Sequence, residues 1–207
     1  MSSQKVAAWA YAEEFVEAGE HIEAAAARGE QLGATPVGNG CGALLRVLAA
    51  AIGARAVMEI GTGVGVSGLW LLGGMPADGI LTTIDVDPEH QRAAREAFAA
   101  AGVPHQRTRV IAGRPLEVLP RMTDGAYDLV IVLADVADYP EYVEQASRLL
   151  RPGGTLVMTW RDTVSDPAAR DGETTTLREV AKAVRDHEQF TTSLVPVSTG
   201  ALVAVKR

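Results

Sequence analysis

The sequence predicts a doubly wound α/β domain, in which a mostly parallel sheet is covered by helices on both faces. Short apolar runs alternate with helical segments five times along the chain, which is the pattern of successive strand–helix–strand units. The run at residues 127–133 (YDLVIVL) is almost entirely apolar, as expected of a central strand buried on both faces. A glycine-rich turn at residues 61–65 follows the first apolar run, and folds of this class bind ligands at that corner.

Composition and charge are those of one globular domain. The chain has 207 residues, of which 47% are hydrophobic and 22% charged, so it can bury a core without a disulfide or a metal. Its 26 acidic and 19 basic residues give a net charge of −7, which argues against a nucleic-acid partner held through phosphates. The only cysteine, Cys41, excludes a disulfide within the chain and fits a reducing compartment. Because no signal peptide or long apolar segment is visible, we expect a cytoplasmic protein without a membrane partner.

The N-terminal segment is predicted to be helical. Residues 6–30 are rich in Ala and Glu and carry Trp9, Phe15, Val16 and Ile22 at helical spacings, which indicates one or two amphipathic helices. We expect residues 1–34 to form a helical extension of a single domain whose core spans residues 35–207. The four apolar side chains have little core left to cover, so we expect a homodimer that buries them against a second copy.

The remaining elements follow from Thr35 onward. Thr35 as an N-cap and Pro36 at the first helical position predict the start of a buried helix. Asp87 and Pro88 predict another helix start in the same way. Strands are expected at residues 56–60, 80–84, 108–112, 127–133 and 155–158; helices at 65–74, 88–101, 115–122, 141–150 and 174–187; and a closing hairpin at 191–197 and 201–206.

The glycine-rich turn favours one class of ligand. A dinucleotide-binding turn would need a glycine where this chain has Val66. Glu59, just before the turn, would repel a pyrophosphate but attract an ammonium group. S-adenosylmethionine carries an ammonium, a sulfonium and one carboxylate, and no phosphate. Ser67 lies in the first turn of the following helix, where its hydroxyl could either donate to that carboxylate or cap the helix. A nicotinamide-dependent reductase is therefore disfavoured.

Further candidate side chains follow the second, third and fourth strands. Asp85 ends the second strand, where a carboxylate can accept both hydroxyls of a ribose; Asp87 is better placed as a helix cap. After the third strand, Gly113, Arg114 and Pro115 could either face an adenine or form a plain turn.

The loop after the fourth strand carries the candidates nearest to a reacting group. Asp135 is the main polar candidate on the methyl-donor side, and Tyr139 and Tyr142 could line an acceptor pocket. Asp138 could act as a base or could cap the next helix.

Five successive motifs resemble those of class I S-adenosylmethionine-dependent methyltransferases. They are MEIGTGVGVSGLWLL, TTIDVDPEH, GRPLEVLP, YDLVIVLADVADYPEYV and LLRPGGTLV, and they are most similar to the catechol and caffeoyl-CoA type O-methyltransferase family, especially its small actinobacterial members. The resemblance implies a seven-stranded Rossmann-like methyltransferase fold in the order 3-2-1-4-5-7-6, with the last strand antiparallel, and a dimer. By position it implies that the donor is contacted by Glu59 and Ser67 (methionine moiety), Gly61 and Gly63 (backbone floor), Asp85 (ribose), and Gly113, Arg114 and Pro115 (adenine).

The chain departs from this family where a metal would bind. The family ends its fourth strand with Asp-Ala-Asp-Lys, whose first Asp binds a divalent cation, and this chain has Leu133, Ala134, Asp135 and Val136 there. The family's later Asp-Asn ligands fall on Thr159-Trp160. Because Mg²⁺ prefers several oxygen ligands, we expect no metal, although Asp135 and Asp162 could rebuild a site.

We therefore predict O-methylation of a small phenol- or catechol-like molecule without the usual metal, with S-adenosylmethionine as cofactor and Asp135 or Asp138 as the base. The alternative is a protein that binds S-adenosylmethionine or its demethylated product without turnover, because the family's metal ligand and lysine are replaced at Leu133 and Val136.

Overall fold

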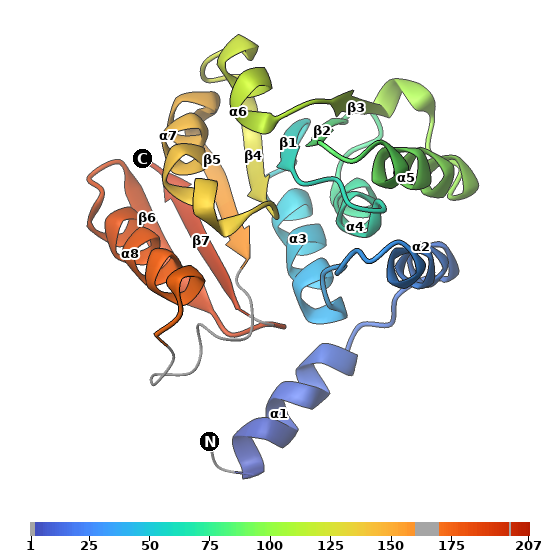
Figure 1. Cartoon of the computed structure of the whole chain (residues 1–207), viewed down its shortest axis with the longest axis horizontal. Helices are drawn as coiled ribbons and strands as arrows, with labels where there is room; N and C mark the ends of the chain where they lie inside the picture. Colours follow the sequence, from blue (N-terminus) through green and yellow to red (C-terminus); the bar gives the residue numbers. More distant parts are fainter. Residues whose placement is uncertain (1–2, 160–169, 199) are drawn as a thin grey trace.

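The computed structural model describes residues 3–159, 170–198 and 200–207 (Figure 1). Its strands are β1 (Ala56–Ile60), β2 (Ile80–Asp85), β3 (Thr108–Ala112), β4 (Tyr127–Val132), β5 (Leu150–Thr159), β6 (Phe190–Val195) and β7 (Ala201–Lys206). Its helices are α1 (Ser3–Glu14), α2 (Glu20–Gln31), α3 (Asn39–Ala51), α4 (Val66–Gly74), α5 (Pro88–Ala100), α6 (Pro115–Val118), α7 (Tyr139–Leu149) and α8 (Gly172–Asp186). Three short 3₁₀ turns complete the described elements: η1 (His105–Arg107), η2 (Leu119–Arg121) and η3 (Val136–Asp138).

The seven strands form one sheet in the order β3-β2-β1-β4-β5-β7-β6. Strands β1 to β5 run parallel to their neighbours, and β7 runs antiparallel to both β5 and β6. This is the order and the antiparallel last strand that the resemblance implies, so the predicted fold class is confirmed. The order reverses direction between β1 and β4, which makes the carboxyl ends of these two strands the corner where doubly wound folds bind ligands.

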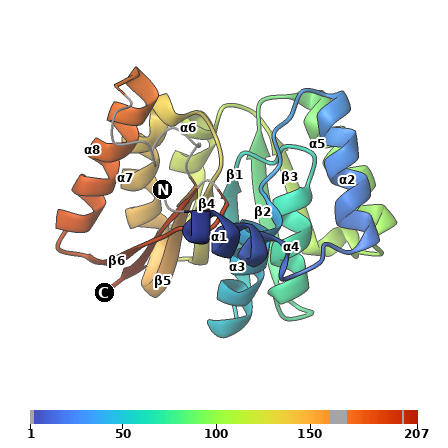
Figure 2. The same ribbon diagram turned by 90° about the horizontal axis from the view of Figure 1, so that it is seen from below.

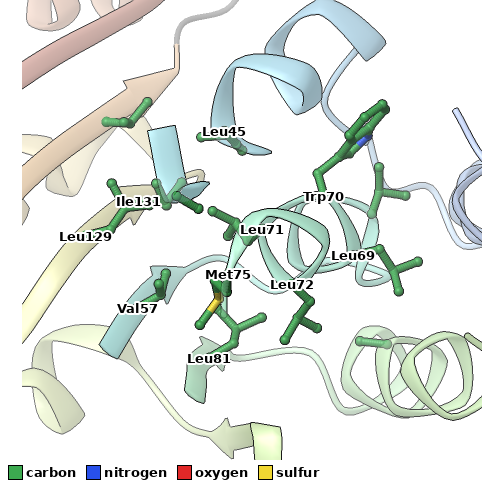
Figure 3. Close-up of a cluster of buried hydrophobic side chains, with 14 of the residues drawn as sticks. Leu45, Val57, Leu69, Trp70, Leu71, Leu72, Met75, Leu81, Leu129 and Ile131 are labelled. Atoms are coloured by element: carbon green, nitrogen blue, oxygen red, sulfur yellow. The ribbon is translucent and has the colours of Figure 1, made fainter. Parts of the chain in front are cut away.

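Both faces of the sheet are apolar. Successive strand residues point to opposite sides, so the apolar strand residues divide between two core clusters. One face packs under α2, α3, α4 and α5, and the other packs under α7 and α8 (Figure 2). Neighbouring residues of β1 divide between them: Val57 belongs to the first cluster and Met58 to the second. Figure 3 shows the first cluster, where Leu71 of α4 points toward the strand residues and Leu45 of α3, whereas Trp70 extends from the same helix away from the strands.

The N-terminal segment forms two helices that pack differently. Helix α2 packs against α4 and α5. Val16 and Ile22 pack against the core of their own chain, so the expectation that these two remain for a partner subunit is wrong. Trp9 remains 43% exposed on α1, the helix that projects from the body of the molecule in Figure 1, and Phe15, just after the end of that helix, is 71% exposed.

A carboxylate from α1 links that helix to the start of α3 and to the turn between β6 and β7. Glu13 Oε2 accepts hydrogen bonds from Gly40 N (3.0 Å) and Ser198 Oγ (2.9 Å), and Glu13 Oε1 accepts one from Ser198 N. Ser198 Oγ in turn accepts from Cys41 N at 3.2 Å. The first amides of α3 are therefore satisfied by side chains from elsewhere in the chain, as helix termini require.

This contact explains a boundary that the sequence misplaces. Helix α3 begins at Asn39 after Gly38, instead of after the expected cap at Thr35. The capping carboxylate belongs to Glu13, which lies 27 residues from Gly40 in the chain. No helix in the described ranges is both long enough and apolar enough to cross a membrane.

Candidate functional site

The loops that follow β1, β2, β3 and β4 meet at the carboxyl edge of the sheet. They carry residues 61–65, 85–87, 113–115 and 133–138, and the strands before them are neighbours in the sheet. The structure therefore brings the sequence-predicted candidates to one edge, beside the reversal of strand order between β1 and β4.

The glycine turn passes tightly between two strand ends. Gly61 N donates to Ile84 O of β2 at 2.9 Å. Gly61 has φ +95°, and a Cβ there would lie 2.8 Å from Leu133 O, just past β4. Only glycine fits this close approach without strain. Gly63 has φ +48° and open space where a Cβ would be, so the turn leaves its backbone uncovered on that side.

Asp85 ties the glycine turn to the neighbouring loops. Its carboxylate accepts from Gly63 N at 2.8 Å and from Asp87 N at 2.9 Å. Its main-chain oxygen accepts from Gly113 N at 3.0 Å and from Gln91 Nε2 at 2.6 Å. Asp85 is only 9% exposed, so water is largely excluded from these contacts, and they place Asp85 at the centre of the candidate site.

Asp87 has the structural role that the sequence favours for it. Its carboxylate accepts from Glu89 N at 2.7 Å and from His90 N at 3.3 Å, and it caps the N-terminus of α5. These amide hydrogen bonds hold the pKa of Asp87 below its usual range.

Glu59 is a fully buried carboxylate beside the same turn. Its Oε2 accepts from Thr83 Oγ1 at 2.6 Å, whereas its Oε1 is buried without a partner of hydrogen-bonding geometry. Burial raises the pKa of Glu59 to about 7, against the lowering effect of the Ser67 and Thr83 hydroxyls and with a further increase from Asp85. A buried acceptor left without a partner is costly in free energy and points to an incoming donor.

Ser67 lies close enough to Glu59 to influence its ionisation and is 5% exposed. Helix α4 begins after Gly65, which has φ +91°, and no side chain caps it. The capping interpretation of Ser67 is therefore wrong, and its hydroxyl acts instead on the carboxyl group of Glu59.

The turn at residues 113–115 leads into α6. Gly113 has φ +147°, and Pro115 is buried at the first position of the helix. The guanidinium of Arg114 is exposed and pairs with Glu117, with 3.7 Å between Nε and Oε1. At this corner Pro115 is the buried residue, whereas the Arg114 side chain is exposed.

The loop after β4 combines a polar and an apolar part. Asp135 is exposed, and its Oδ1 accepts from Ala137 N at 3.0 Å, which caps η3. Asp138 is half-buried and accepts from Tyr142 Oη at 3.3 Å. Its side chain does not cap α7. Leu133 packs against the apolar core, and its amide donates to Ile60 O at 2.8 Å.

The expectation that Tyr139 and Tyr142 line an acceptor pocket needs correction. The two residues are 2% and 1% exposed and belong to the core cluster under α7. Tyr139 Oη donates to Thr159 O at 2.9 Å, which fixes the end of β5. Burial, followed by the charge of Asp138, raises the pKa of Tyr142, so its phenol stays protonated.

The sequence-based interpretation missed two hydroxyl residues of the site. Thr62 and Thr83 are 1% and 0% exposed, and their Oγ1 atoms lie 2.6 Å apart. Among the residues that the structure describes, no group of three His, Cys, Asp or Glu side chains is arranged to hold a metal. Trp160, Arg161 and Asp162 lie outside the described residues.

The buried carboxylate gives a pH signature of folding. A group with a folded pKa of about 7 keeps a proton that the unfolded chain releases near pH 4.5. Its contribution to stability is therefore present below pH 4.5 and is lost as pH rises to about 7. Relative to Glu59→Gln, the wild-type free energy of unfolding should fall by about 3 kcal/mol across this range. Urea unfolding from pH 4.5 to 8 measures the difference, and parallel curves for the two proteins would contradict it.

Comparison with known proteins identifies the family. The family described as O-methyltransferase matches residues 13–207. A Mycobacterium tuberculosis protein named "Probable O-methyltransferase" is 48% identical over 201 residues, covering 96% of this chain and 90% of that protein. A Corynebacterium glutamicum crystal structure superposes with a TM-score of 0.88 at 29% identity, covering 99% of this chain and 97% of that one.

A third similar protein has been solved with a bound cofactor. The O-methyltransferase of Streptomyces achromogenes involved in tomaymycin synthesis, solved in complex with S-adenosylmethionine, has a TM-score of 0.83 at 28% identity and covers 100% of this chain and 99% of that one. These matches confirm the resemblance of the five motifs. The chain belongs to the O-methyltransferase family of S-adenosylmethionine-dependent enzymes.

Proposed function

We propose that this protein transfers a methyl group from S-adenosylmethionine to a hydroxyl oxygen of a small phenol- or catechol-like molecule, and that it does so without a divalent metal. The observation that carries the proposal is the buried carboxylate of Glu59, whose Oε1 lacks a partner, beside a glycine turn that is partly exposed at Gly61 and Gly63. A cationic, phosphate-free ligand matches this arrangement, because an ammonium would satisfy the oxygen and favour its ionised form.

The remaining donor contacts are assigned by position around the same turn. Ser67 and the N-terminus of α4 suit the donor's carboxylate, since that end of a helix favours negative charge. Asp85 suits the ribose: an ionised carboxylate has about four acceptor positions, and two of them already hold Gly63 N and Asp87 N. The backbone of Gly61 and Gly63 forms the floor of the donor site. Gly113, Arg114 and Pro115 border the adenine, and Asp135 lies on the side of the methyl group.

Methyl transfer to a hydroxyl requires that donor and acceptor are held in position and that one group accepts the hydroxyl proton. Methyl transfer from a sulfonium is an in-line displacement, so holding donor and acceptor in line supplies most of the rate. The acceptor hydroxyl has to lose its proton, and we assign this step to Asp138 or Asp135. Asp138 is half-buried and oriented by Tyr142, which suits a base in reach of the sheet edge.

Metal independence rests on the residues at the family's ligand positions. Leu133 packs into the apolar core and offers no side-chain oxygen. At Thr159 the main-chain oxygen already accepts from Tyr139, and a neutral hydroxyl is a poor ligand for a hard dication.

The reaction and its metal dependence can be tested together. Labelled methyl transfer from S-adenosylmethionine to a panel of phenols and catechols should proceed equally with and without EDTA, and added Mg²⁺ should not raise it. In the same assay Asp138→Asn or Asp135→Asn should lower kcat by about 10²-fold or more, whichever is the base.

Two outcomes would redirect the assignment. Loss of activity on chelation with recovery in Mg²⁺ would point to Asp135 and Asp162 as relocated ligands. Binding of S-adenosylmethionine and its demethylated product without turnover on any acceptor would favour the alternative of a binding protein.

The ribose assignment has a matched control next to it in the chain. Asp85→Ala should weaken S-adenosylmethionine binding about ten-fold or more, because charge-assisted hydrogen bonds to the hydroxyls are lost. Asp87→Ala removes a helix cap at a cost of about 1 kcal/mol in stability and should leave the affinity unchanged. Calorimetry measures both. An Asp85→Ala affinity within two-fold of wild type, with the fold intact by circular dichroism, would remove Asp85 from the ribose site.

We also propose a homodimer that covers α1. Trp9 and Tyr11 are 43% and 68% exposed on that helix, and Phe15, just after its end, is 71% exposed. A second copy would remove this apolar surface from water. Light scattering should give roughly twice the chain mass of 21.8 kDa, and Tyr11→Ser with Phe15→Ser should shift it toward one chain. A wild-type mass of a single chain at high concentration would exclude the dimer. We further propose that the methyl acceptor is a small molecule, that the protein binds no nucleic acid, and that it is located in the cytoplasm.

A further inference from the structure

We propose that Thr83 and Thr62 are positioning residues for the methyl donor: they form a directed hydrogen-bond chain that holds Oε2 of Glu59 and turns Oε1 toward the donor's ammonium. This inference rests on the proposed function of the site. It adds two residues to which neither the motifs nor the family comparison assigns a role.

The hydrogen-bond chain joins three separate segments of the protein. Glu59 lies on β1 and Thr83 lies directly beside it on β2, as partners in the parallel register. Thr62 comes from the glycine turn. Thr83 Oγ1 lies 2.6 Å from Glu59 Oε2 and 2.6 Å from Thr62 Oγ1. All three side chains are at most 1% exposed, so water does not compete for these contacts.

The direction of the chain follows from counting protons. A threonine hydroxyl has one proton to donate, and an ionised carboxylate can only accept. Thr83 therefore donates to Glu59, and Thr62 has to donate to Thr83. The two hydroxyls hold one carboxylate oxygen and leave the other, Oε1, as the buried acceptor without a partner.

A purely structural role explains the two hydroxyls poorly. Strands β1 and β2 are already joined by their backbone ladder from Ala56 to Ile60. Valine has nearly the shape of threonine and suits a buried strand well. Replacing a buried hydrogen-bonded pair by apolar groups of the same shape can be almost neutral for stability. The hydroxyls at positions 62 and 83 are therefore better explained by what they do to Glu59.

The hydrogen-bond chain also affects the pH range in which Glu59 is charged. The Thr83 hydrogen bond lowers the pKa of Glu59, whereas burial and the nearby Asp85 raise it. Asp85 is the charged group that acts on Glu59 from the neighbouring strand. Without Thr83 the carboxylate should stay protonated to a higher pH, and the donor's ammonium would lose its counter-charge there.

The test compares two buried threonines of one strand. Thr83→Val should weaken S-adenosylmethionine binding about five- to ten-fold at pH 7 and should move the pH midpoint of the affinity upward. Thr82→Val loses the same hydroxyl from the opposite face of β2, where Thr82 is 4% exposed, and should bind as wild type does. Thr83→Ser should restore most of the affinity, and Thr62→Val should give a smaller loss than Thr83→Val.

A second ligand separates positioning from a general disturbance of the pocket. 5′-Methylthioadenosine lacks the ammonium and the carboxylate, so Thr83→Val should leave its affinity unchanged. Equal losses for both ligands, or no loss for either, would overturn the inference. A wild-type protein that binds neither ligand would contradict the proposed function, and with it the role of the two threonines in donor binding.

Discussion

The site depends on one steric constraint: the turn after β1 has to pass between the carboxyl ends of β2 and β4. Gly61 makes this passage, bonded to Ile84 on one side and close to Leu133 O on the other. A side chain at that position would push the strand ends apart. The position of Gly63 N above Asp85, and with it the shape of the whole edge, follows from this passage.

The carboxylates at this edge have opposite energetics. Asp85 accepts hydrogen bonds from backbone amides of two loops, so it organises the loops around it. Glu59 is buried with one free oxygen, so it lowers the stability of the chain without ligand at neutral pH. Such a cost persists where function uses it. One carboxylate thus builds the site, and the other gives it a preference for positive charge.

Most of the fold could be predicted, because apolar runs and turn residues report local structure directly. β1 and β3 begin and end where the apolar pattern does, and Asp87 with Pro88 marks the start of α5. The errors come from interactions between distant segments. The start of α3 depends on Glu13, which no local pattern reveals. Thr83 is missed because a threonine in a strand looks like any β-branched strand former; only its register opposite Glu59 gives it a role.

The contact between Glu13 and Ser198 spans 185 residues, which affects the order in which the protein can assemble on the ribosome. At translation rates of 5–20 residues per second, the serine emerges about 10–40 s after the glutamate. During that time α1 has Gly40 as an early partner but lacks the turn between β6 and β7. The tilted ring pair of Tyr11 on α1 and Phe15 just after it, with centroids 6.0 Å apart, is accessible to chaperones and to neighbouring nascent chains throughout this period. Completion of the last hairpin is what finally anchors the first helix.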